Sequence, residues 1–263
     1  MKEFQRIWFI GDIHGSYLPI YNFYNRNKNS TNFSAETDCI ILLGDVGANY
    51  YLNHRDKDFK KKLSQFPFTY FCVRGNHEAR ASVCAYNDPD NWNLEQFFKG
   101  SVWVEEEYPN IKYALDQPHI YNILGNKTLI IPGAYSVDKY HRLKKGWSWF
   151  ENEQLSEEEM NLGRRFIKLN PAFDLVLSHT CPIIYEPTDL FLSFVDQSLV
   201  DKTMERYLGE IEYKLDYKYW LWGHYHEYRR YPVEKDGRQR IMLSAGKEVL
   251  LLDDIKNQIV KRY

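Results

Sequence analysis

Cysteine is scarce in this sequence of 263 residues, and its four cysteines are scattered without any C-x-x-C pair. This pattern argues against a disulfide framework and is typical of a reducing compartment. Cys39 and Cys72 lie in apolar, strand-like runs, where a free thiol behaves as a small hydrophobic side chain. Cys181 closely follows His179, and we interpret it as part of a neighbouring loop rather than as a soft metal ligand. We therefore expect a cytoplasmic protein.

Long apolar runs and an excess of one charge are also missing. The longest apolar runs, such as residues 39–43, fall far short of the roughly 20 residues that a membrane span needs. No signal peptide is visible, because the chain enters an apolar run at residues 4–10. The formal charge is −2, from 34 basic and 36 acidic residues. No global field draws such a protein to nucleic acid or membrane, so we expect neither a stable nucleic-acid complex nor a membrane partner.

The composition is that of a chain with a full core, since 44% of its residues are hydrophobic. The sequence has no internal repeat and no low-complexity linker. We therefore expect one domain over residues 1–263. Residues 80–118 are less regular than the rest, and we interpret them as an insertion or lid within that domain.

Short apolar runs alternate with longer amphipathic ones in the first third of the chain. Residues 4–10, 39–43 and 69–73 are rich in Ile, Leu, Val and aromatic side chains, and a glycine follows each run. Residues 17–28 and 56–66 have the length and polarity of helices. This β-α-β-α-β order predicts a parallel sheet with helices on its face, and an α/β fold.

Strands also alternate with loops and helices in the rest of the chain. We predict strands at 119–124 and 127–131 with a Gly125-Asn126 turn, at 173–177, and at 217–222. Residues 153–169 are predicted as a helix, since Ser156 and Glu159 have capping-box spacing and Pro171 follows. Antiparallel strands are predicted at residues 229–233, 240–244, 249–252 and 258–262, with Asp236-Gly237 joining one pair.

Five short polar motifs occur in order along the chain, each after a run of apolar or aromatic residues. They contain two aspartates, one asparagine and five of the eight histidines. The motifs are Gly11-Asp12-Ile13-His14-Gly15, Gly44-Asp45, Gly75-Asn76-His77-Glu78, Ser178-His179 and Gly223-His224-Tyr225-His226. Carboxylate, amide and imidazole groups in this combination suit a pair of borderline divalent ions. Such a site predicts a hydrolase of phosphate esters.

The spacing within two motifs brings ligands to one side of an extended chain. Asp12 and His14 are two residues apart, as are His224 and His226, so each pair can reach a single ion. Asp45 has two carboxylate oxygens and can bridge two cations. Two bridged ions would lie roughly 3.5–4 Å apart.

These motifs, D-x-H, GD, GNH[DE], a later His and G-H-x-H, resemble those of the calcineurin-like metallophosphoesterases, and the resemblance spans residues 7–246. It implies a four-layer sandwich of two mixed sheets between helices, with the metal site at the carboxyl ends of strands. It also implies two sets of ligands that share a bridging aspartate. One ion would take Asp12, His14, Asp45 and His226, and the other Asp45, Asn76, His179 and His224.

The same resemblance implies that His77 is not a ligand but stands near the substrate, where it protonates the leaving oxygen or stabilises charge on the phosphoryl group. An imidazole suits this role because it titrates near neutrality. Arg74 is the best candidate to bind a phosphate oxygen, and Arg142 is a weaker one that could equally be a surface arginine. Gly47 departs from the pattern, since many relatives have an acidic residue or Asn there. The departure weakens a serine/threonine phosphatase assignment and leaves the metal site unaffected.

We expect a phosphomonoesterase that uses two divalent ions, with Mn²⁺ first and Fe, Zn, Co or Ni as alternatives. Its substrate would be a small phosphate ester, a nucleotide or a phosphoprotein. A phosphodiesterase or nucleotide hydrolase of the same fold is one alternative. A non-catalytic, protein-binding scaffold is another, which the complete ligand set and His77 disfavour. Aromatic residues in 92–103 and 135–149 either border the pocket or belong to the core or a lid.

Overall fold

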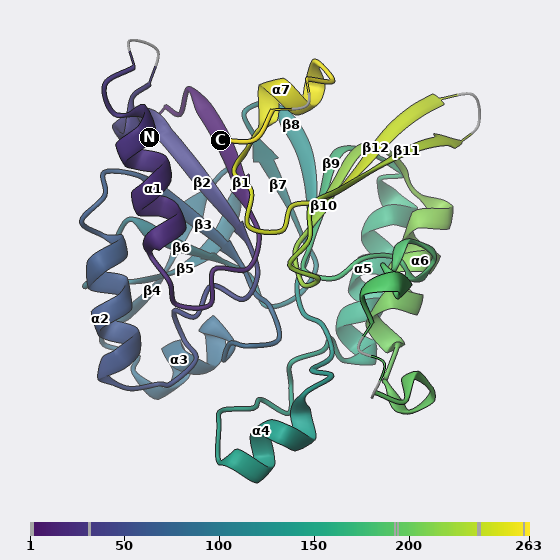
Figure 1. Ribbon diagram of the computed structural model, residues 1–263, viewed down its shortest axis with the longest axis horizontal. Helices are drawn as coiled ribbons and strands as arrows, with labels where there is room; N and C mark the ends of the chain where they lie inside the picture. The colour runs from purple at the N-terminus through teal and green to yellow at the C-terminus, as the bar shows by residue number, and fades with distance from the viewer. Residues whose placement is uncertain (1–2, 31–32, 192, 194, 236–237, 260) are drawn as a thin grey trace.

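The computed structural model of the chain describes residues 3–30, 33–191, 193, 195–235, 238–259 and 261–263. Its centre is a pair of mixed β-sheets that face each other (Figure 1). The first sheet has seven strands in the order β13-β1-β2-β3-β6-β5-β4. Their bounds are β13 Leu250–Leu251, β1 Arg6–Ile10, β2 Asp38–Leu43, β3 Thr69–Val73, β6 Ile111–Ala114, β5 Gly100–Glu105 and β4 Trp92–Phe97. Strands β1, β2, β3 and β6 are parallel, and antiparallel strands complete both edges.

The second sheet has six strands in the order β11-β12-β10-β9-β8-β7. Their bounds are β11 Arg229–Lys235, β12 Arg238–Ser244, β10 Asp216–Trp222, β9 Ala172–Ser178, β8 Asn126–Ile131 and β7 His119–Ile123. Strands β12, β10, β9 and β8 are parallel, with an antiparallel strand at each edge. The predicted fold class, two mixed sheets with helices outside them, is confirmed.

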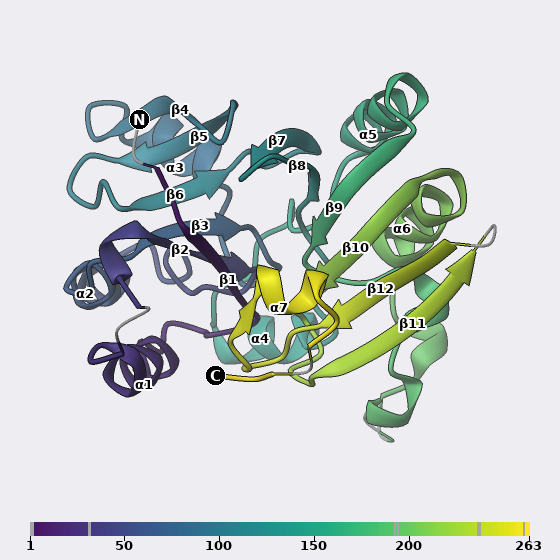
Figure 2. The same ribbon diagram turned by 90° about the horizontal axis from the view of Figure 1, so that it is seen from above.

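Helices cover the outer faces of both sheets (Figure 2). Helices α1 (Leu18–Asn27), α2 (His54–Leu63) and α3 (Ala81–Asn87) accompany the first sheet. Helices α5 (Glu157–Leu169) and α6 (Thr203–Lys214) pack on the second. The short helices α4 (Lys139–Lys145) and α7 (Leu252–Lys256) lie apart from these layers.

Strand β1 shows why the strands read as continuous apolar runs. Ile7 and Phe9 belong to the core between the sheets, while Trp8 and Ile10 pack in the core beneath α1 and α2. Because successive side chains point to opposite faces, a strand between two cores must be apolar at every position. The result is four layers with three cores, and the polar motifs are left for the strand ends.

Several predicted boundaries agree with the structure and others do not. The capping box forms, with Ser156 accepting from the backbone N–H of Glu159 and the Glu159 carboxylate accepting from that of Ser156. The helix begins at Glu157, so its predicted start at residue 153 is wrong. The hairpin pairs Ile123 with Asn126, which makes Leu124-Gly125 the turn rather than Gly125-Asn126. Both turn residues have positive φ, 47° and 82°, the geometry of tight hairpin turns.

The last quarter of the chain differs more. Only residues 250–251 of the predicted strand 249–252 pair, and they pair with β1. Residues 252–256 form α7, and among the described residues of 258–262 none is in a strand. Strands β11 and β12 are antiparallel as predicted, although β12 is parallel to β10. The Asp236-Gly237 turn lies outside the described residues.

Residues 80–118 contribute α3 and three strands that extend the first sheet. The prediction that they form an insertion or lid, and that of a single domain over residues 1–263, stay predictions. No helix in the described ranges is both long enough and apolar enough to cross a membrane.

Candidate metal centre

The polar motifs gather where five parallel strands end. The first three follow β1, β2 and β3 of one sheet, and the last two follow β9 and β10 of the other. Carboxyl ends of parallel strands meet along one edge of a sheet, where open α/β sheets place ligands. Two such edges come together here, so residues more than 200 positions apart become neighbours.

The turns after these strands are unusually tight. His14, Asp45, His224 and His226 have φ angles of 45°, 47°, 68° and 56°. Non-glycine residues rarely adopt this left-handed conformation, and such strained residues cluster at functional sites. The turns aim four different side chains at one small volume.

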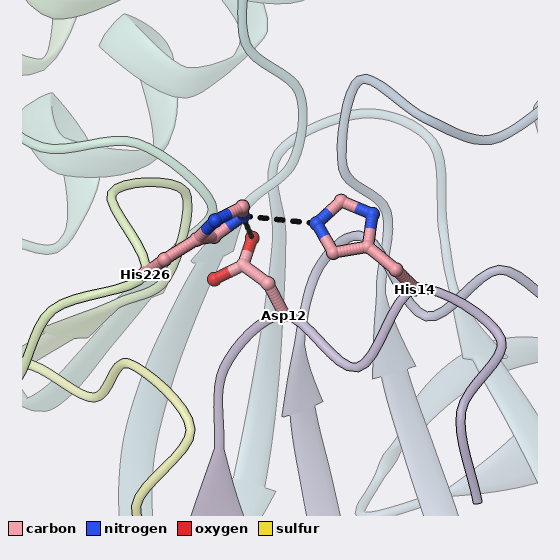
Figure 3. Close-up of side chains that lie close together, drawn as sticks. All are labelled: Asp12, His14 and His226. Carbon is pink, nitrogen blue, oxygen red and sulfur yellow. Dashed lines mark hydrogen bonds and ion pairs between the residues drawn. The ribbon is translucent and has the colours of Figure 1, made fainter.

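Asp12, His14 and His226 form the first group of side chains (Figure 3). The Nε2 atoms of His14 and His226 are 2.9 Å apart, and His226 Nε2 is 3.9 Å from Asp12 Oδ1. Two imidazole nitrogens bound at right angles to one ion, each at about 2.1 Å, would be about 3 Å apart. The spacing of the two histidines therefore fits a shared ion.

Asp45, His179 and His224 form the second group, with Asn76 beside it. His179 Nε2 lies 3.3 Å from Asp45 Oδ1 and 2.9 Å from Asn76 Oδ1. The Nδ1 atom of His179 lies 2.8 Å from the backbone oxygen of Leu43, which fixes the ring with Nε2 toward the site.

Asp45 lies between the two groups. Its Oδ2 is 3.8 Å from Nε2 of His14, and its Oδ1 is the atom closest to His179. The third set of candidate ligands, His14, Asp45 and His77, joins the groups through the same carboxylate. His77 is partly exposed, with Nε2 3.8 Å from Asp45 Oδ2, and its backbone N–H donates to Asp45 Oδ1 at 2.8 Å. The structure thus brings together all seven predicted ligands and His77.

The buried carboxylates of the cluster are stabilised by nearby positive charge. Burial raises the pKa of Asp12 to about 7, and its Oδ2 atom is buried with no hydrogen-bond partner in the described part of the chain. Burial also acts to raise the pKa of Asp45, but His179, His77 and His14 outweigh it and hold that pKa well below its usual value. Burial alone would lower the pKa of His179, yet Asp45 and Asp12 raise it to about 9. Without cations a proton on His179 balances the carboxylates, so the residues present fit divalent ions well.

Other side chains hold the ligands in place. The amide nitrogen of Asn76 donates to Ser136 Oγ at 2.9 Å, which leaves the amide oxygen facing the site. Ser136 in turn donates from its hydroxyl and its backbone N–H to the buried carboxylate of Glu153. Glu78 accepts from the backbone N–H of Gly47 at 2.8 Å and of Gly75 at 3.3 Å, and so ties two of the motif turns together.

Two glycines are required by close packing around these ligands. A Cβ atom on Gly44, whose φ is 94°, would lie 2.0 Å from His179 Nδ1. A Cβ atom on Gly47, whose φ is 81°, would lie 2.3 Å from the backbone nitrogen of Gly15. In this chain, the turn at Gly47 leaves no room for a side chain.

Arg74 does not line either of the cavities that open on the cluster. It is buried, its Nη1 donates to the backbone oxygen of Glu153 at 2.7 Å, and its Nε lies 3.4 Å from Asp116. Burial lowers its pKa to about 10. This position favours a role in anchoring the segment at Glu153, and the predicted contact of Arg74 with substrate stays a prediction.

Two cavities flank the cluster and share His14, His77 and Asp138. The first has a volume of about 510 Å³, with Tyr50, Arg55, Arg142 and Trp147 in its wall. The second has a volume of about 790 Å³ and a largely apolar wall. Apolar and aromatic side chains of this second wall include Tyr135, Val137, Leu190, Phe191, Val195 and Tyr225.

Sequence reasoning missed the supporting residues Ser136, Glu153 and Glu78. It also left Arg142 open as a surface arginine, whereas the structure buries it in the wall of the first cavity. Glu78 belongs to one of the five motifs, so its position indicated a role in the site. The sequence did not show that its carboxylate accepts hydrogen bonds from the backbone of Gly47 and Gly75. Ser136 and Glu153 carry no local signal, because Ser136 contacts Asn76 from a segment 60 residues away in the sequence, and the Glu153 carboxylate acts through Ser136.

Comparisons with known proteins were consistent with this geometry. A family model described as calcineurin-like phosphoesterase matches residues 5–228. The crystal structure of TT1561 from Thermus thermophilus is similar in fold, at 12% identity and a TM-score of 0.53, over 99% of this chain and 97% of that one. A dimetal phosphatase from Danio rerio matches at 11% identity and a TM-score of 0.44, over 95% and 92% of the two chains. Comparison with curated proteins finds no match.

Proposed function

The chain belongs to the calcineurin-like phosphoesterase family and is a metal-dependent hydrolase of phosphate esters, and we propose that its substrates are small phosphomonoesters. The observation that supports a two-ion hydrolytic site is the position of Asp45. Its two carboxylate oxygens face different groups of histidines, as a residue that bridges two cations requires.

The proposed ligands follow from this position. Asp12, His14, Asp45 and His226 would hold one ion, and Asp45, Asn76, His179 and His224 the other. Bound ions of this kind supply an activated water molecule near pH 7 and neutralise the phosphoryl oxygens during in-line attack. Imidazole, carboxylate and amide ligands accept Mn²⁺, Fe, Co, Ni or Zn, and we propose Mn²⁺ as the activating ion.

His77 is the proposed proton donor to the leaving oxygen. It lines both cavities, so an ester group in either one would lie beside its ring. Burial lowers the pKa of His77 to about 4, against the attraction of Asp45. An anionic phosphoryl group beside the ring would act to raise that pKa.

The second cavity supports a small organic ester as substrate. Lys202 is the one lysine or arginine among the described residues that line it, and it is paired with Glu186 at 2.6 Å. Asp201 and Glu205 add negative charge to the same wall. Apart from the proposed metal ions, a polyanion such as nucleic acid would find no unpaired lysine or arginine among the described residues of this wall. An uncharged aryl or alkyl group would contact apolar side chains. The four unpaired cysteines support a reducing, cytoplasmic location.

A phosphodiesterase is the second candidate, because two cavities on either side of the cluster could hold two ester groups. The experiment that separates the candidates compares p-nitrophenyl phosphate with bis(p-nitrophenyl) phosphate. Chelator-stripped protein should hydrolyse neither ester, and Mn²⁺ should restore hydrolysis of the monoester in preference to the diester. Preference for the bis-ester would identify a phosphodiesterase, and no turnover of either ester despite bound metal would refute the proposal for small esters.

A further inference from the structure

Helix α4 carries one buried side chain, and it is an arginine. Arg142 has no exposed surface, whereas the other residues of Lys139–Lys145 are exposed or partly exposed. Figure 1 shows α4 standing apart from the helices that cover the sheets, below the carboxyl ends of the strands. A short exposed helix that buries only a charged residue is not explained by packing of an apolar core.

The guanidinium group of Arg142 is only partly satisfied by the protein. Its Nε donates to Oδ2 of Asp138 at 2.9 Å. Its Nη1 and Nη2 atoms are buried and have no hydrogen-bond partner in the described ranges of the chain. An arginine cannot shed its charge in a protein, and a buried donor without a partner carries the full penalty of lost hydration. Such a group points to a ligand that supplies the missing acceptors.

Arg142 lies in the wall of the first cavity together with His14 and His77 of the metal cluster. Its charge is close enough to act on His77, whose pKa is lowered first by burial and also by Arg142. Tyr50 and Arg55 line the same cavity. An anion that sits on the cluster beside His77 is therefore within the electrostatic reach of this guanidinium group.

We propose that Arg142 binds two non-bridging oxygens of the substrate's phosphoryl group through Nη1 and Nη2. Because Asp138 accepts the hydrogen bond from Nε, the Nη1 and Nη2 atoms remain free. These two atoms can donate to two oxygens of one phosphoryl group at the same time. Asp138 is thus a positioning residue for Arg142. The inference rests on the proposed function and deepens it, because it names the group that recognises the phosphate.

The same contact explains a preference for monoesters. A phosphomonoester is largely a dianion near neutral pH, whereas a diester carries a single negative charge. In a diester, the oxygen that would carry the second charge of a monoester is bonded to the second organic group. A monoester has three non-bridging oxygens and a diester two, so a monoester that gives one oxygen to the ions keeps two for Arg142, whereas a diester keeps one. Arg142 therefore favours the monoester and becomes the residue that decides between the two classes.

The test compares Arg142→Met with Lys144→Met, which removes a positive charge from an exposed site on the same helix. Binding of inorganic phosphate to the Mn²⁺-loaded protein is measured by calorimetry, and kcat and KM are measured for both nitrophenyl esters. For Arg142→Met we expect phosphate affinity and monoester kcat/KM to fall about 10- to 100-fold, because the substitution removes the charge-assisted hydrogen bonds to the phosphoryl group. Turnover of the bis-ester should fall less than about threefold, and Lys144→Met should behave like the wild type.

Two further measurements distinguish recognition from a structural role. Arg142→Met should retain its metal and unfold at the same or a higher temperature, because it removes two buried Nη donors that have no partner among the described residues and only one hydrogen bond, that from Nε to Asp138. Asp138→Asn should weaken phosphate binding by a smaller factor, and Arg142→Lys should recover part of the loss of Arg142→Met.

The inference is overturned if Arg142→Met binds phosphate as tightly as Lys144→Met does, or if both esters lose activity to the same extent. Failure of the proposed function has a different signature, since the wild type would then prefer the bis-ester or hydrolyse neither ester. Calorimetric binding of phosphate, which needs no turnover, still decides the role of Arg142 in that case.

Discussion

Replacing Gly44 by alanine probes how the strand-end turns hold the metal ligands. Gly44 has a φ of 94°, and an added Cβ would lie 2.0 Å from Nδ1 and 2.5 Å from Cγ of His179. His179 has no exposed surface and its Nδ1 is 2.8 Å from the backbone oxygen of Leu43, so the ring cannot swing away freely. The substitution must therefore displace a predicted ligand.

The size of the effect follows from two contributions. Alanine in a left-handed conformation costs about 1–2 kcal/mol. Overpacking a buried site adds about 1–3 kcal/mol, so Gly44→Ala should lower the free energy of unfolding of the metal-free protein by about 2–5 kcal/mol. Gly125→Ala is the matched control, because Gly125 has a φ of 82° and nothing within 4 Å of its added Cβ. It should lose only about 1–2 kcal/mol, the backbone contribution.

Chemical denaturation of the metal-free proteins measures both losses, and titration with Mn²⁺ followed by calorimetry measures metal binding. Gly44→Ala should lose one of two bound ions or bind it at least about 100-fold more weakly, because His179 is displaced. Gly125→Ala should bind as the wild type does. Equal stability losses in the two variants, together with unchanged Mn²⁺ binding by Gly44→Ala, would refute both the steric reasoning and the assignment of His179 as a ligand.

Three other substitutions test the site. Asp45→Asn should weaken the binding of both ions by more than about 10-fold and abolish turnover. Normal activity with near-stoichiometric metal in that variant would contradict the bridging role. His77→Ala should keep its metal and lower kcat about 10²- to 10⁴-fold; a loss of metal as large as that of Asp45→Asn would instead make His77 a ligand. Burial raises the pKa of Glu205 to about 7 from 4.5, so the folded protein holds this proton more tightly than the unfolded chain and loses stability as the pH rises between those values. Glu205→Gln, which keeps the acceptor for Thr180, should therefore raise the free energy of unfolding by about 3 kcal/mol at pH 8 and have little effect near pH 4; a gain independent of pH would contradict this.

The local features of the chain were readable from the sequence because they depend on neighbours. Strand β3 covers Thr69–Val73 as predicted, since a short run rich in aromatic and β-branched side chains is typical of a strand buried on both faces. The capping box at Ser156 forms because its two hydrogen bonds join residues three apart. The candidate metal ligands could be grouped for a related reason, because each motif follows its strand directly and the strand order of an α/β fold places such ends together.

Features that depend on distant residues were missed or misjudged. Residues 258–262 contain two adjacent β-branched residues and were predicted as a strand, but β1 already pairs with β13, and the chain forms α7 before it reaches them. The hairpin turn moved by one residue because the pairing of Ile123 with Asn126 set its register.

The two arginines separate the two kinds of information most clearly. Arg74 adjoins a motif and was preferred as the residue that binds phosphate. Arg142 lies in a polar segment, and the sequence left open that it is a surface arginine. The sequence by itself determined the residue types of the site, the ends of the strands that carry them and the family to which the chain belongs. Only the tertiary structure decided that Arg74 reaches Glu153 and that Arg142 is buried in the wall of a cavity beside His77. The physical reason is that the partners of a long charged side chain are set by the packing of segments far apart in sequence, which no local pattern records.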